Sequence, residues 1–313
     1  MVCQCTLNFL GYSALALIAY RIFTAVYNVL FPYFIGAPVD LHKKAGAKWA
    51  VVTGATDGIG KAYATQLAKK KFNVYLISRT QSKLDETKKE IEAAAPGVEV
   101  RTYAFDFGAS TKAAYEPLIK ELEKVEIGIL VNNVGMSFEY PEVLHAQEGG
   151  LQRLADMTTI NCLPPVLLSA VALKQMSERK AGIVINIASA AGYNEMSHWN
   201  VYSAGKRFVL HLSGILRAEY AGAGVTVQAI APMLVATKMS KIKRASFFGP
   251  FAEAFVAQAL RTVGLVHETT GYFSHQIQAE IMNLLPQIVR DKIISNQTLA
   301  VRAAALRKKA KAQ

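Results

Sequence analysis

Cysteine is scarce in this chain of 313 residues, which contains only Cys3, Cys5 and Cys162. Two of the three stand at the extreme N-terminus, so a framework of disulfides is excluded. A chain of this length can bury a hydrophobic core without covalent crosslinks. We therefore expect the protein to work in a reducing compartment, or on a membrane face that looks into one.

Acidic residues are also few, with 23 Asp and Glu against 35 Lys and Arg, which gives a net charge of +12. Such an excess favours anionic partners, among them nucleotides, coenzyme A esters and lipid headgroups. The basic residues gather at 238–244 and 302–311, but no aromatic interleaving or known motif accompanies them. Nucleic acid is therefore not an expected partner.

One long apolar stretch runs from about Leu7 to Ala37 and contains a single charge, Arg21. About 20 such residues are enough for a membrane helix. Two placements fit. In one the helix covers 7–26 and Arg21 reaches back to the interface, and in the other it begins near Ile22.

Two alternatives to a membrane anchor stay open for this stretch. A cleaved signal peptide needs a basic start, which Met1–Leu10 lacks, and a buried helix of a soluble domain is the other alternative. Positive charge follows the stretch, at Lys43, Lys44 and Lys48. This charge predicts that the main body lies on the cytoplasmic side of the membrane.

From Lys48 onward, apolar strand patterns alternate with helical patterns. The expected strands are 49–52, 73–77, 98–104, 127–131, 183–188 and 226–230. The expected helices are 61–71, 82–95, 113–123, a long helix through Asn161, and 202–220. This alternation predicts an α/β fold of the Rossmann type, a doubly wound parallel sheet, with an N-terminal membrane helix.

After Gly271 the chain becomes helical and amphipathic. Apolar residues recur at near-helical spacing, at Ile277, Ile281, Leu284, Leu285 and Ile288. We interpret this stripe as facing the core, in preference to a membrane or partner surface.

The first expected strand runs into the sequence TGATDGIG, residues 53–60. Gly54 permits a tight turn, Gly58 lets the backbone approach a pyrophosphate, and Gly60 allows close packing of helix on strand. The following helix presents its free N–H groups to phosphate. We expect the loop to bind a dinucleotide, with contacts from Gly54, Thr56, Asp57, Gly58, Ile59 and Gly60.

The residues at the end of the second strand indicate which dinucleotide the loop binds. An NAD site places a carboxylate there, whereas this chain has Arg79, with Lys83 beyond it, and no acid before Asp85. A guanidinium suits a 2′-phosphate, so NADP(H) is the expected cofactor. The remaining expected contacts are Asp106, Asn133, Tyr202, Lys206 and Thr237, and no metal is expected.

Tyr202 and Lys206 stand four residues apart, on one face of an expected helix. Ser189 lies 13 residues upstream of Tyr202, at the carboxyl end of the fifth strand, where α/β sheets bind ligands. Asn161 lies on the preceding long helix. These four residues are the candidate catalytic set.

Together the motifs TGATDGIG, NNVG, Asn161, Ser189 and YSAGK, in this order, resemble the short-chain dehydrogenase/reductase superfamily over about 48–271. The N-terminal anchor, SRTQSKL and IAPMLVATKMS are similar to its microsomal branch, which holds very-long-chain 3-oxoacyl-CoA reductases, 17β-hydroxysteroid dehydrogenases of types 3 and 12, and invertebrate steroid-dehydrogenase-like proteins. Met233 follows Pro232 where many members have glycine. We expect an anchor at 1–40, an NADP-binding domain at 46–271 and an amphipathic extension with a basic tail at 272–313.

The residue chemistry suggests a mechanism of carbonyl reduction. Tyr202 would donate the proton, with its pKa lowered by Lys206 and the nicotinamide. Ser189 would donate a hydrogen bond to the same oxygen, Lys206 would also hold the nicotinamide ribose, and Asn161 would anchor a water that relays protons.

The substrate is expected to be lipophilic, either a very-long-chain 3-oxoacyl-CoA or a 17-ketosteroid. Ser189, Met233 and Leu234 are the expected contacts, and Val235, Phe247, Phe248, Phe251 and Phe255 extend an apolar slot unless the phenylalanines are simply core. Lys238, Lys241, Lys243 and Arg244 would receive coenzyme A phosphates or dock on anionic lipid. The alternatives are an oxidative steroid or retinol dehydrogenase and a catalytically silent NADP-binding scaffold.

The last five residues contain Lys309 and Lys311 in a K-x-K-x-x pattern that resembles the dilysine retrieval signal of endoplasmic-reticulum membrane proteins. We therefore expect an endoplasmic-reticulum membrane protein whose catalytic domain faces the cytosol. Its expected partners are the lipophilic substrate and the membrane, and a homodimer is an open alternative to a monomer.

Overall fold

The computed structural model describes residues 3–242 and 244–311. Its centre is a seven-stranded parallel sheet with the order β3-β2-β1-β4-β5-β6-β7. The strands are β1 Trp49–Thr53, β2 Asn73–Ser78, β3 Val100–Ala104, β4 Ile127–Asn132, β5 Gly182–Ile187, β6 Val225–Ile230 and β7 Glu268–Thr269. The first six were expected, and their order reverses beside β1, as in Rossmann folds. The two-residue β7 was missed because it is too short to carry a pattern.

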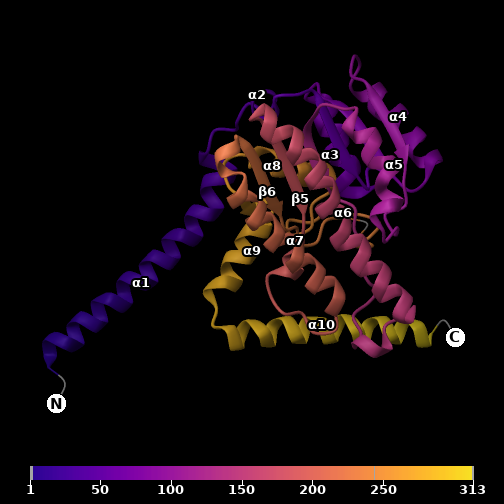
Figure 1. Ribbon diagram of the computed structural model, residues 1–313. Helices are drawn as coiled ribbons and strands as arrows, with labels where there is room; N and C mark the ends of the chain where they lie inside the picture. The colour runs from indigo at the N-terminus through magenta and orange to yellow at the C-terminus, as the bar shows by residue number, and fades with distance from the viewer. Residues whose placement is uncertain (1–2, 243, 312–313) are drawn as a thin grey trace.

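Helices cover both faces of the sheet (Figure 1). One face carries α3 Gly58–Lys69, α4 Gln81–Ala94 and α8 Ala252–Arg261, and the other carries α5 Lys112–Glu123, α6 Gly150–Arg179 and α7 Asn200–Glu219. Every residue of β4 and β5 is buried, as expected for strands that are covered on both sides. Short turns of helix complete the body: α2 Leu41–Ala45, η2 Leu144–Ala146, η3 Ala190–Gly192 and η4 Ala221–Ala223.

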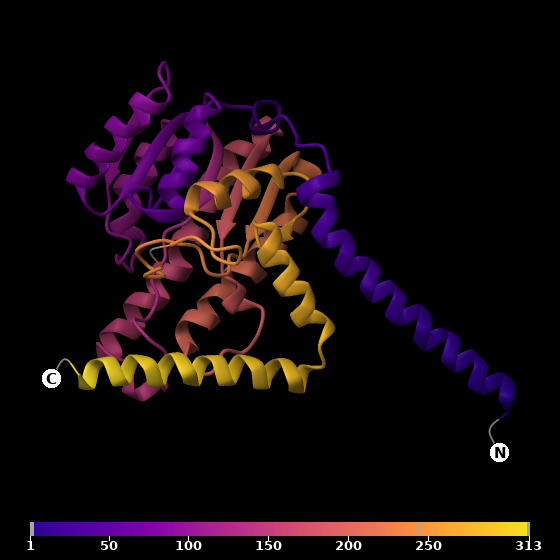
Figure 2. The same ribbon diagram turned by 180° about the vertical axis from the view of Figure 1, so that it is seen from behind.

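The N-terminal segment is a long helix, α1 Gln4–Leu30, which continues as a π-helical turn, η1 Phe31–Ile35. It projects away from the body (Figures 1 and 2), and only Ala25 of α1 is buried. The alternative of a buried core helix is therefore wrong. Among the described residues, α6 is also apolar and long enough to cross a membrane, but it packs into the body through Leu168, Leu173 and Met176.

The C-terminal extension forms two helices, α9 Phe273–Leu284 and α10 Gln287–Ala310, which meet at Leu285–Pro286. Figure 2 shows α10 lying across the body below α6 and α7. The expectation that the apolar stripe faces the core is wrong for its second half, because Ile281, Leu284 and Ile288 are 55%, 41% and 83% exposed.

Candidate functional site

The glycine turn between β1 and α3 has the shape that the sequence predicts. Gly54 and Gly58 have positive φ angles of 62° and 51°, which favour glycine. A Cβ atom at Gly60 would lie 2.3 Å from the carbonyl oxygen of Gly54, and one at Gly58 would lie 3.1 Å from Cγ2 of Thr237. Gly58 and Gly60 therefore have little room for a side chain, and Thr237 lies directly beside Gly58.

Thr53 and Asn133 hold this turn against the end of β4. The Oγ1 of Thr53 accepts from the backbone N–H groups of Asn133 and Val134, at 2.9 and 3.0 Å. The Nδ2 of Asn133 donates to the carbonyl oxygens of Thr53 and Gly54, at 3.0 and 3.3 Å. Asn133 thus supports the loop, and Thr53 is a supporting residue that the sequence analysis missed. Its position as the polar end of an apolar strand was the available signal.

The expected ribose and adenine contacts lie at the carboxyl ends of β2 and β3. Thr56 shares a hydrogen bond of 3.0 Å with Ser78. Arg79, directly after β2, and Lys83, in the first turn of α4, are exposed. The Oδ1 of Asp106 accepts from the backbone N–H of Gly108 at 2.9 Å. An exposed guanidinium beside the turn is free to meet a phosphate.

Asp57 and Ile59 have structural partners. Asp57 caps α3 by accepting from the backbone N–H of Gly58 at 2.7 Å, and its other carboxylate oxygen lies 3.3 Å from the Nζ of Lys238. Ile59 is partly buried against the hydrophobic core. Neither contact excludes a nearby cofactor, since the backbone of this turn remains the feature that phosphate would meet.

The candidate catalytic side chains converge at the carboxyl end of β5. The Oγ of Ser189 caps the turn after the strand by accepting from the backbone N–H of Ala191 at 3.1 Å. Tyr202 and Lys206 stand on the first turns of α7, and the Nζ of Lys206 lies 5.9 Å from the centre of the Tyr202 ring. That Nζ also donates to the carbonyl oxygen of Ile187 at 3.1 Å.

Asn161 reaches the same place from α6. Its amide forms two hydrogen bonds with the backbone of Met136, accepting from N–H at 3.1 Å and donating to the carbonyl oxygen at 2.9 Å. A Cβ atom at Gly135 would lie 3.0 Å from the Oδ1 of Asn161 and 3.2 Å from the Nζ of Lys206. The glycine of the NNVG motif therefore lets the segment after β4 pass between these two side chains.

Burial controls the protonation of this cluster. Burial raises the pKa of Tyr202, and a hydrogen bond with Ser189 opposes that rise. Desolvation of the hydroxyl thus outweighs that hydrogen bond in the protein alone, and the expected lowering by Lys206 together with the nicotinamide stays a prediction. Burial also lowers the pKa of Lys206 to about 8. At neutral pH Tyr202 holds its proton, as a proton donor must, and Lys206 is mostly charged.

The segment after β6, residues 233–251, is pinned by the first turn of α9. The Nδ1 of His275 accepts from the backbone N–H of Met233 at 3.4 Å, and its Nε2 contacts the carbonyl oxygen of Phe248 at 3.2 Å. The Oγ of Ser274 donates to the carbonyl oxygen of Phe247 at 2.6 Å. The imidazole is fully buried, and burial lowers its pKa to about 4, so it is neutral and Nε2 is the donor. The sequence analysis missed His275, because a lone histidine carries no motif.

The expected apolar slot is only partly present. Phe255 is fully buried in the core, so its assignment to the slot is wrong, and Val235 is also buried among core residues. Met233 is partly buried, while Leu234 and the phenylalanines of the loop expose their side chains. Phe247, Phe248 and Phe251 therefore line the outside of this segment rather than the core.

Two cations of the basic cluster already have acidic neighbours. Lys238 pairs with Asp57, and Lys241 pairs with Glu139 on the segment after β4. Arg244 is exposed, and Lys243 lies outside the described residues. These exposed pairs bridge the segment after β6 to the nucleotide loop and to the segment after β4.

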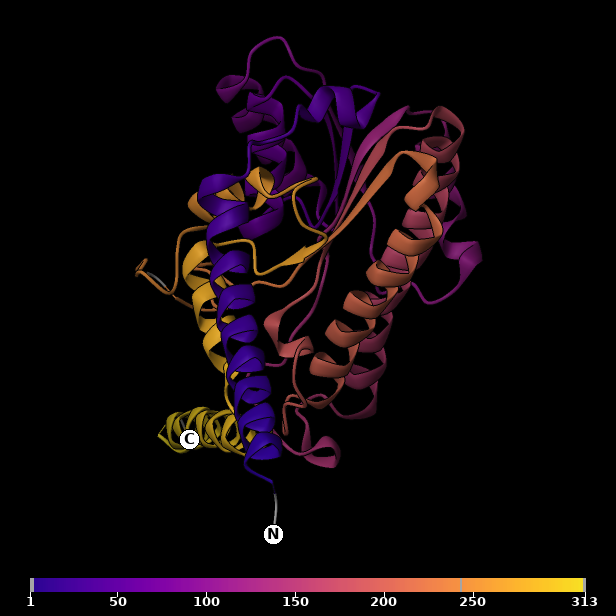
Figure 3. The same cartoon turned by 90° about the vertical axis from the view of Figure 1, so that its left-hand side faces the viewer.

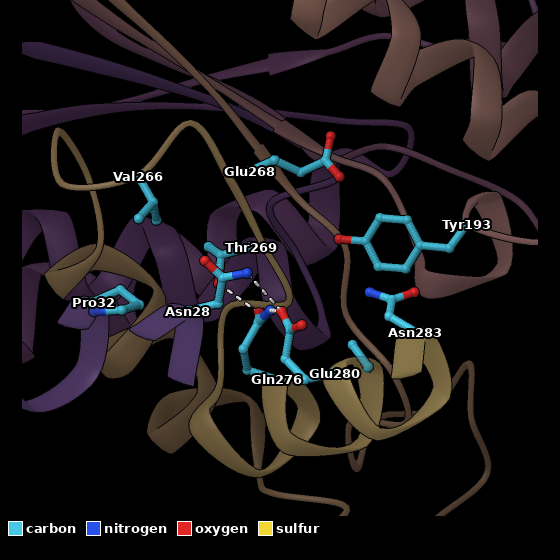
Figure 4. A pocket seen from close by; sticks show the side chains of 10 residues that line it. Asn28, Pro32, Tyr193, Val266, Glu268, Thr269, Gln276, Glu280 and Asn283 are labelled. Atoms are coloured by element: carbon cyan, nitrogen blue, oxygen red, sulfur yellow. Dashed lines mark hydrogen bonds between the residues drawn. The ribbon is translucent and has the colours of Figure 1, made fainter. Parts of the chain in front are cut away.

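A cavity of about 280 Å³ lies between α1, β7 and α9 (Figure 4). Its walls include the polar side chains of Asn28, Tyr193, Glu268, Gln276 and Glu280. Burial raises the pKa values of Tyr193 and Glu268. Such polar walls do not suit a long apolar chain, so this cavity is not a candidate site for a lipophilic substrate.

Comparison with known proteins decides the family. The family model for short chain dehydrogenases matches residues 48–246, more than half of the chain. The chain belongs to the short-chain dehydrogenase/reductase family. It is thus an oxidoreductase by family, and the resemblance drawn from the motifs is confirmed.

Individual relatives cover nearly the whole chain. The very-long-chain 3-oxoacyl-CoA reductase let-767 of Caenorhabditis elegans is 59% identical over 99% of this chain and 98% of its own. A steroid-dehydrogenase-like protein of the same organism is 49% identical over 95% of each chain. Among solved structures, a metagenomic short-chain oxidoreductase in complex with NADP is 28% identical, covers 71% of this chain and 95% of its own, and has a TM-score of 0.57.

Proposed function

We propose that this protein is an NADPH-dependent reductase of very-long-chain 3-oxoacyl-CoA. The observation that carries the proposal is the convergence of Asn161, Ser189, Tyr202 and Lys206 near the glycine turn, in a chain 59% identical to a 3-oxoacyl-CoA reductase. The 59% relative carries the name of the acyl-CoA enzyme, whereas the steroid-dehydrogenase-like relative is 49% identical.

The residues at the glycine turn fit a dinucleotide. Gly54 and Gly58 give the turn its positive φ angles, and Gly60 lets it pack closely on the N-terminus of α3. That N-terminus attracts phosphate, and Arg79 offers a guanidinium for the 2′-phosphate. Thr56 lies in this turn, Thr237 lies beside Gly58, and Asp106 follows β3. NADPH bound there would supply the hydride.

The chain's own residues then control the proton and the carbonyl oxygen. Ser189 donates a hydrogen bond to the 3-oxo oxygen and holds it toward Tyr202, which is protonated at neutral pH. Tyr202 transfers that proton to the oxygen as negative charge develops on it. Lys206 stabilises the resulting phenolate, and Asn161 keeps the adjoining backbone at Met136 in place. The product is the 3-hydroxyacyl-CoA.

The test uses the purified full-length chain in detergent with NADPH and a panel of 3-oxoacyl-CoAs and 17-ketosteroids. We expect turnover of the long acyl-CoAs, and turnover of ketosteroids alone would refute the acyl-CoA assignment. Turnover of neither would support the silent scaffold.

Charge reversal at the basic residues of the segment after β6 separates the two substrate classes further. Lys241→Glu with Arg244→Glu should raise KM for acyl-CoA by about 10-fold for each phosphate that no longer meets a cation, and leave KM for a ketosteroid unchanged. Lys124→Glu is the matched control, because Lys124 pairs with Glu121 at the end of α5, away from the segment after β6. An equal rise for both substrates would argue against phosphate recognition.

We further propose that α1 anchors the protein in the endoplasmic-reticulum membrane, with the catalytic domain in the cytosol. The exposed apolar surface of α1 and the lysines that follow it support this placement. Carbonate extraction should leave the full-length chain in the membrane fraction and release a chain that lacks 1–40. Lys309→Ser with Lys311→Ser should let the protein leave the reticulum, and unchanged location would count against the dilysine signal.

A further inference from the structure

Arg21 on α1 is bound to the far end of α9. Its Nη2 donates to the carbonyl oxygen of Asn283 at 2.8 Å, one residue before α9 ends at Leu284. The last carbonyl groups of a helix lack partners within the helix and carry partial negative charge, so a guanidinium there is well placed. Nearby, the Nδ2 of Asn28 donates to the Oε1 of Glu280 at 3.0 Å. The two contacts hold α9 along the second half of α1 (Figures 1 and 3).

Arg21 also divides α1 into two parts. The part before it, from Gln4 to Tyr20, has about 17 residues and a length of about 26 Å, close to the thickness of a bilayer's hydrocarbon core. This part stands free of the body (Figures 1 and 2) and exposes its apolar side chains. Since a charged side chain belongs at the water interface, Arg21 would mark the cytosolic edge of the bilayer in the proposed anchoring of α1.

The corner where α9 meets α10, residues 281–289, lies at the same level. It is in direct contact with Arg21 through Asn283, on the side of the body from which α1 projects (Figures 1 and 2). The corner exposes apolar side chains, with Ile281 55% and Ile288 83% exposed, and Leu284 and Val289 also exposed. Lys292 stands one turn further along α10 and is exposed as well.

We propose that this α9–α10 corner inserts into the cytosolic leaflet beside α1 and forms a second membrane contact. The inference rests on the proposed anchoring of α1. Apolar side chains at an interfacial helix end reach about 5–10 Å into the headgroup and acyl boundary, and Lys292 would meet the lipid phosphates. Because the corner adjoins the anchoring helix α1 at Arg21, we infer that lipid covers its exposed apolar side chains.

Two contacts would fix how the body faces the membrane. A single helix lets the body rotate about the anchor, whereas the corner and α1 together stop that rotation. The first turn of α9 also carries the segment after β6, because Ser274 and His275 bind the carbonyl oxygens of Phe247 and Phe248. Phe273 stacks edge-to-face between Phe34 and Phe247, with ring centres 5.7 and 5.4 Å apart. The corner would thus hold the exposed phenylalanines of the segment after β6 in one orientation relative to the bilayer.

The experiment measures depth in the bilayer at single labelled positions of the full-length chain. Cys3, Cys5 and Cys162 are replaced by serine, an environment-sensitive fluorophore is attached at Ile288→Cys, and the protein is reconstituted into phosphatidylcholine vesicles. Lipids brominated near the headgroup quench a fluorophore that lies at a shallow depth, and lipids brominated near the chain end quench one that lies deep in the bilayer. Leu15→Cys on α1 is the positive control, and Val301→Cys, half-exposed on the same helix α10, is the matched negative control.

We expect the Ile288 label to lose emission to the shallow quencher, the Leu15 label to the deep quencher and the Val301 label to neither. An unquenched Ile288 label beside a quenched Leu15 label would overturn the corner contact and leave the anchor intact. An unquenched Leu15 label would overturn the anchor itself. Emission at Ile288 that responds to the protein-to-lipid ratio and not to bromine would show that a second copy covers the corner, which also overturns the proposal. None of these outcomes depends on turnover.

Discussion

Arg302 forms a bidentate ion pair with Glu142, which lies 160 positions earlier in the sequence. Its Nε and Nη2 donate to the two carboxylate oxygens at 2.8 Å each. Glu142 is buried, and its backbone is tied to the start of α7. Its N–H donates to the carbonyl oxygen of His198, and its carbonyl oxygen accepts from Asn200. Since Asn200 stands two residues before Tyr202, the C-terminal helix α10 is linked to the segment that positions the proton donor.

Arg302→Leu should lower both the thermal stability and kcat, because it leaves a buried carboxylate without its partner. Arg302→Lys is the control, since it keeps the charge but loses the bidentate geometry. Its thermal stability and kcat should lie between those of the wild type and those of Arg302→Leu. Thermal unfolding and steady-state kinetics at neutral pH measure these effects. A kcat equal to that of the wild type would show that the link does not reach Tyr202.

The same pair predicts a pH dependence. Arg302 holds the pKa of Glu142 below its ordinary value. The pair's contribution to the free energy of unfolding is therefore complete above the unfolded pKa of about 4.3, and it is lost as the pH falls through the folded pKa. The stability difference between the wild type and Arg302→Leu should thus shrink in acid. A difference that stays constant from neutral pH into acid would contradict this assignment.

Tyr202→Phe should lower kcat by about 10²- to 10⁴-fold while NADPH binding stays close to normal, because only the proton donor is removed. Turnover and cofactor fluorescence titration of the same preparation provide the measurement. Retention of more than about a tenth of the activity would show that another group supplies the proton.

Lys206 predicts the alkaline limit of the reaction. Its pKa is lowered to about 8 by burial, so it is charged below that pH and neutral above it. We expect kcat/KM for ketone reduction to fall as the pH rises through about 8, because the charge that stabilises the Tyr202 phenolate is lost. A profile of kcat/KM against pH tests this role of Lys206, and a kcat/KM that keeps rising above about pH 8 would contradict it.

Arg79→Asp should move cofactor preference from NADPH toward NADH. The exposed guanidinium directly after β2 is the group proposed for the 2′-phosphate, and a charged hydrogen bond of this kind contributes about 1.5–3 kcal/mol. The ratio of kcat/KM for the two cofactors should change by roughly 10- to 100-fold. Arg101→Asp, on the surface of β3, is a control that should leave the ratio unchanged. A wild type that prefers NADH would refute the proposal outright.

His275→Phe should raise KM for the lipid substrate and lower the stability by about 1–3 kcal/mol, because the N–H of Met233 and the carbonyl of Phe248 lose their buried partner. The affinity for NADPH should not change, since His275 on α9 contacts the segment after β6 and not the glycine turn. Steady-state kinetics measure KM for the lipid substrate, and a cofactor titration measures the affinity for NADPH. Unchanged KM would mean that the segment keeps its shape without this residue.

Local patterns in the sequence were enough to predict six of the seven strands, the helices between them and the long apolar N-terminal helix. The reason is that strand and helix periodicities, and the turn at Gly54 and Gly58, depend on neighbouring residues. The candidate set Asn161, Ser189, Tyr202 and Lys206 was also nameable, because the carboxyl ends of parallel strands meet at one edge of a sheet.

The tertiary structure alone decided which surfaces are buried and which charges are paired. Periodicity showed an apolar stripe after Gly271 but not that Ile288 faces outward, since a stripe does not say what lies against it. No pattern pointed to His275, or to the pairing of Arg302 with Glu142. The contact of Arg21 with Asn283 spans 262 positions, and a contact between such distant segments leaves no local trace. The direction of the Tyr202 pKa was likewise a matter of burial, which exists only once the chain has folded around the side chain.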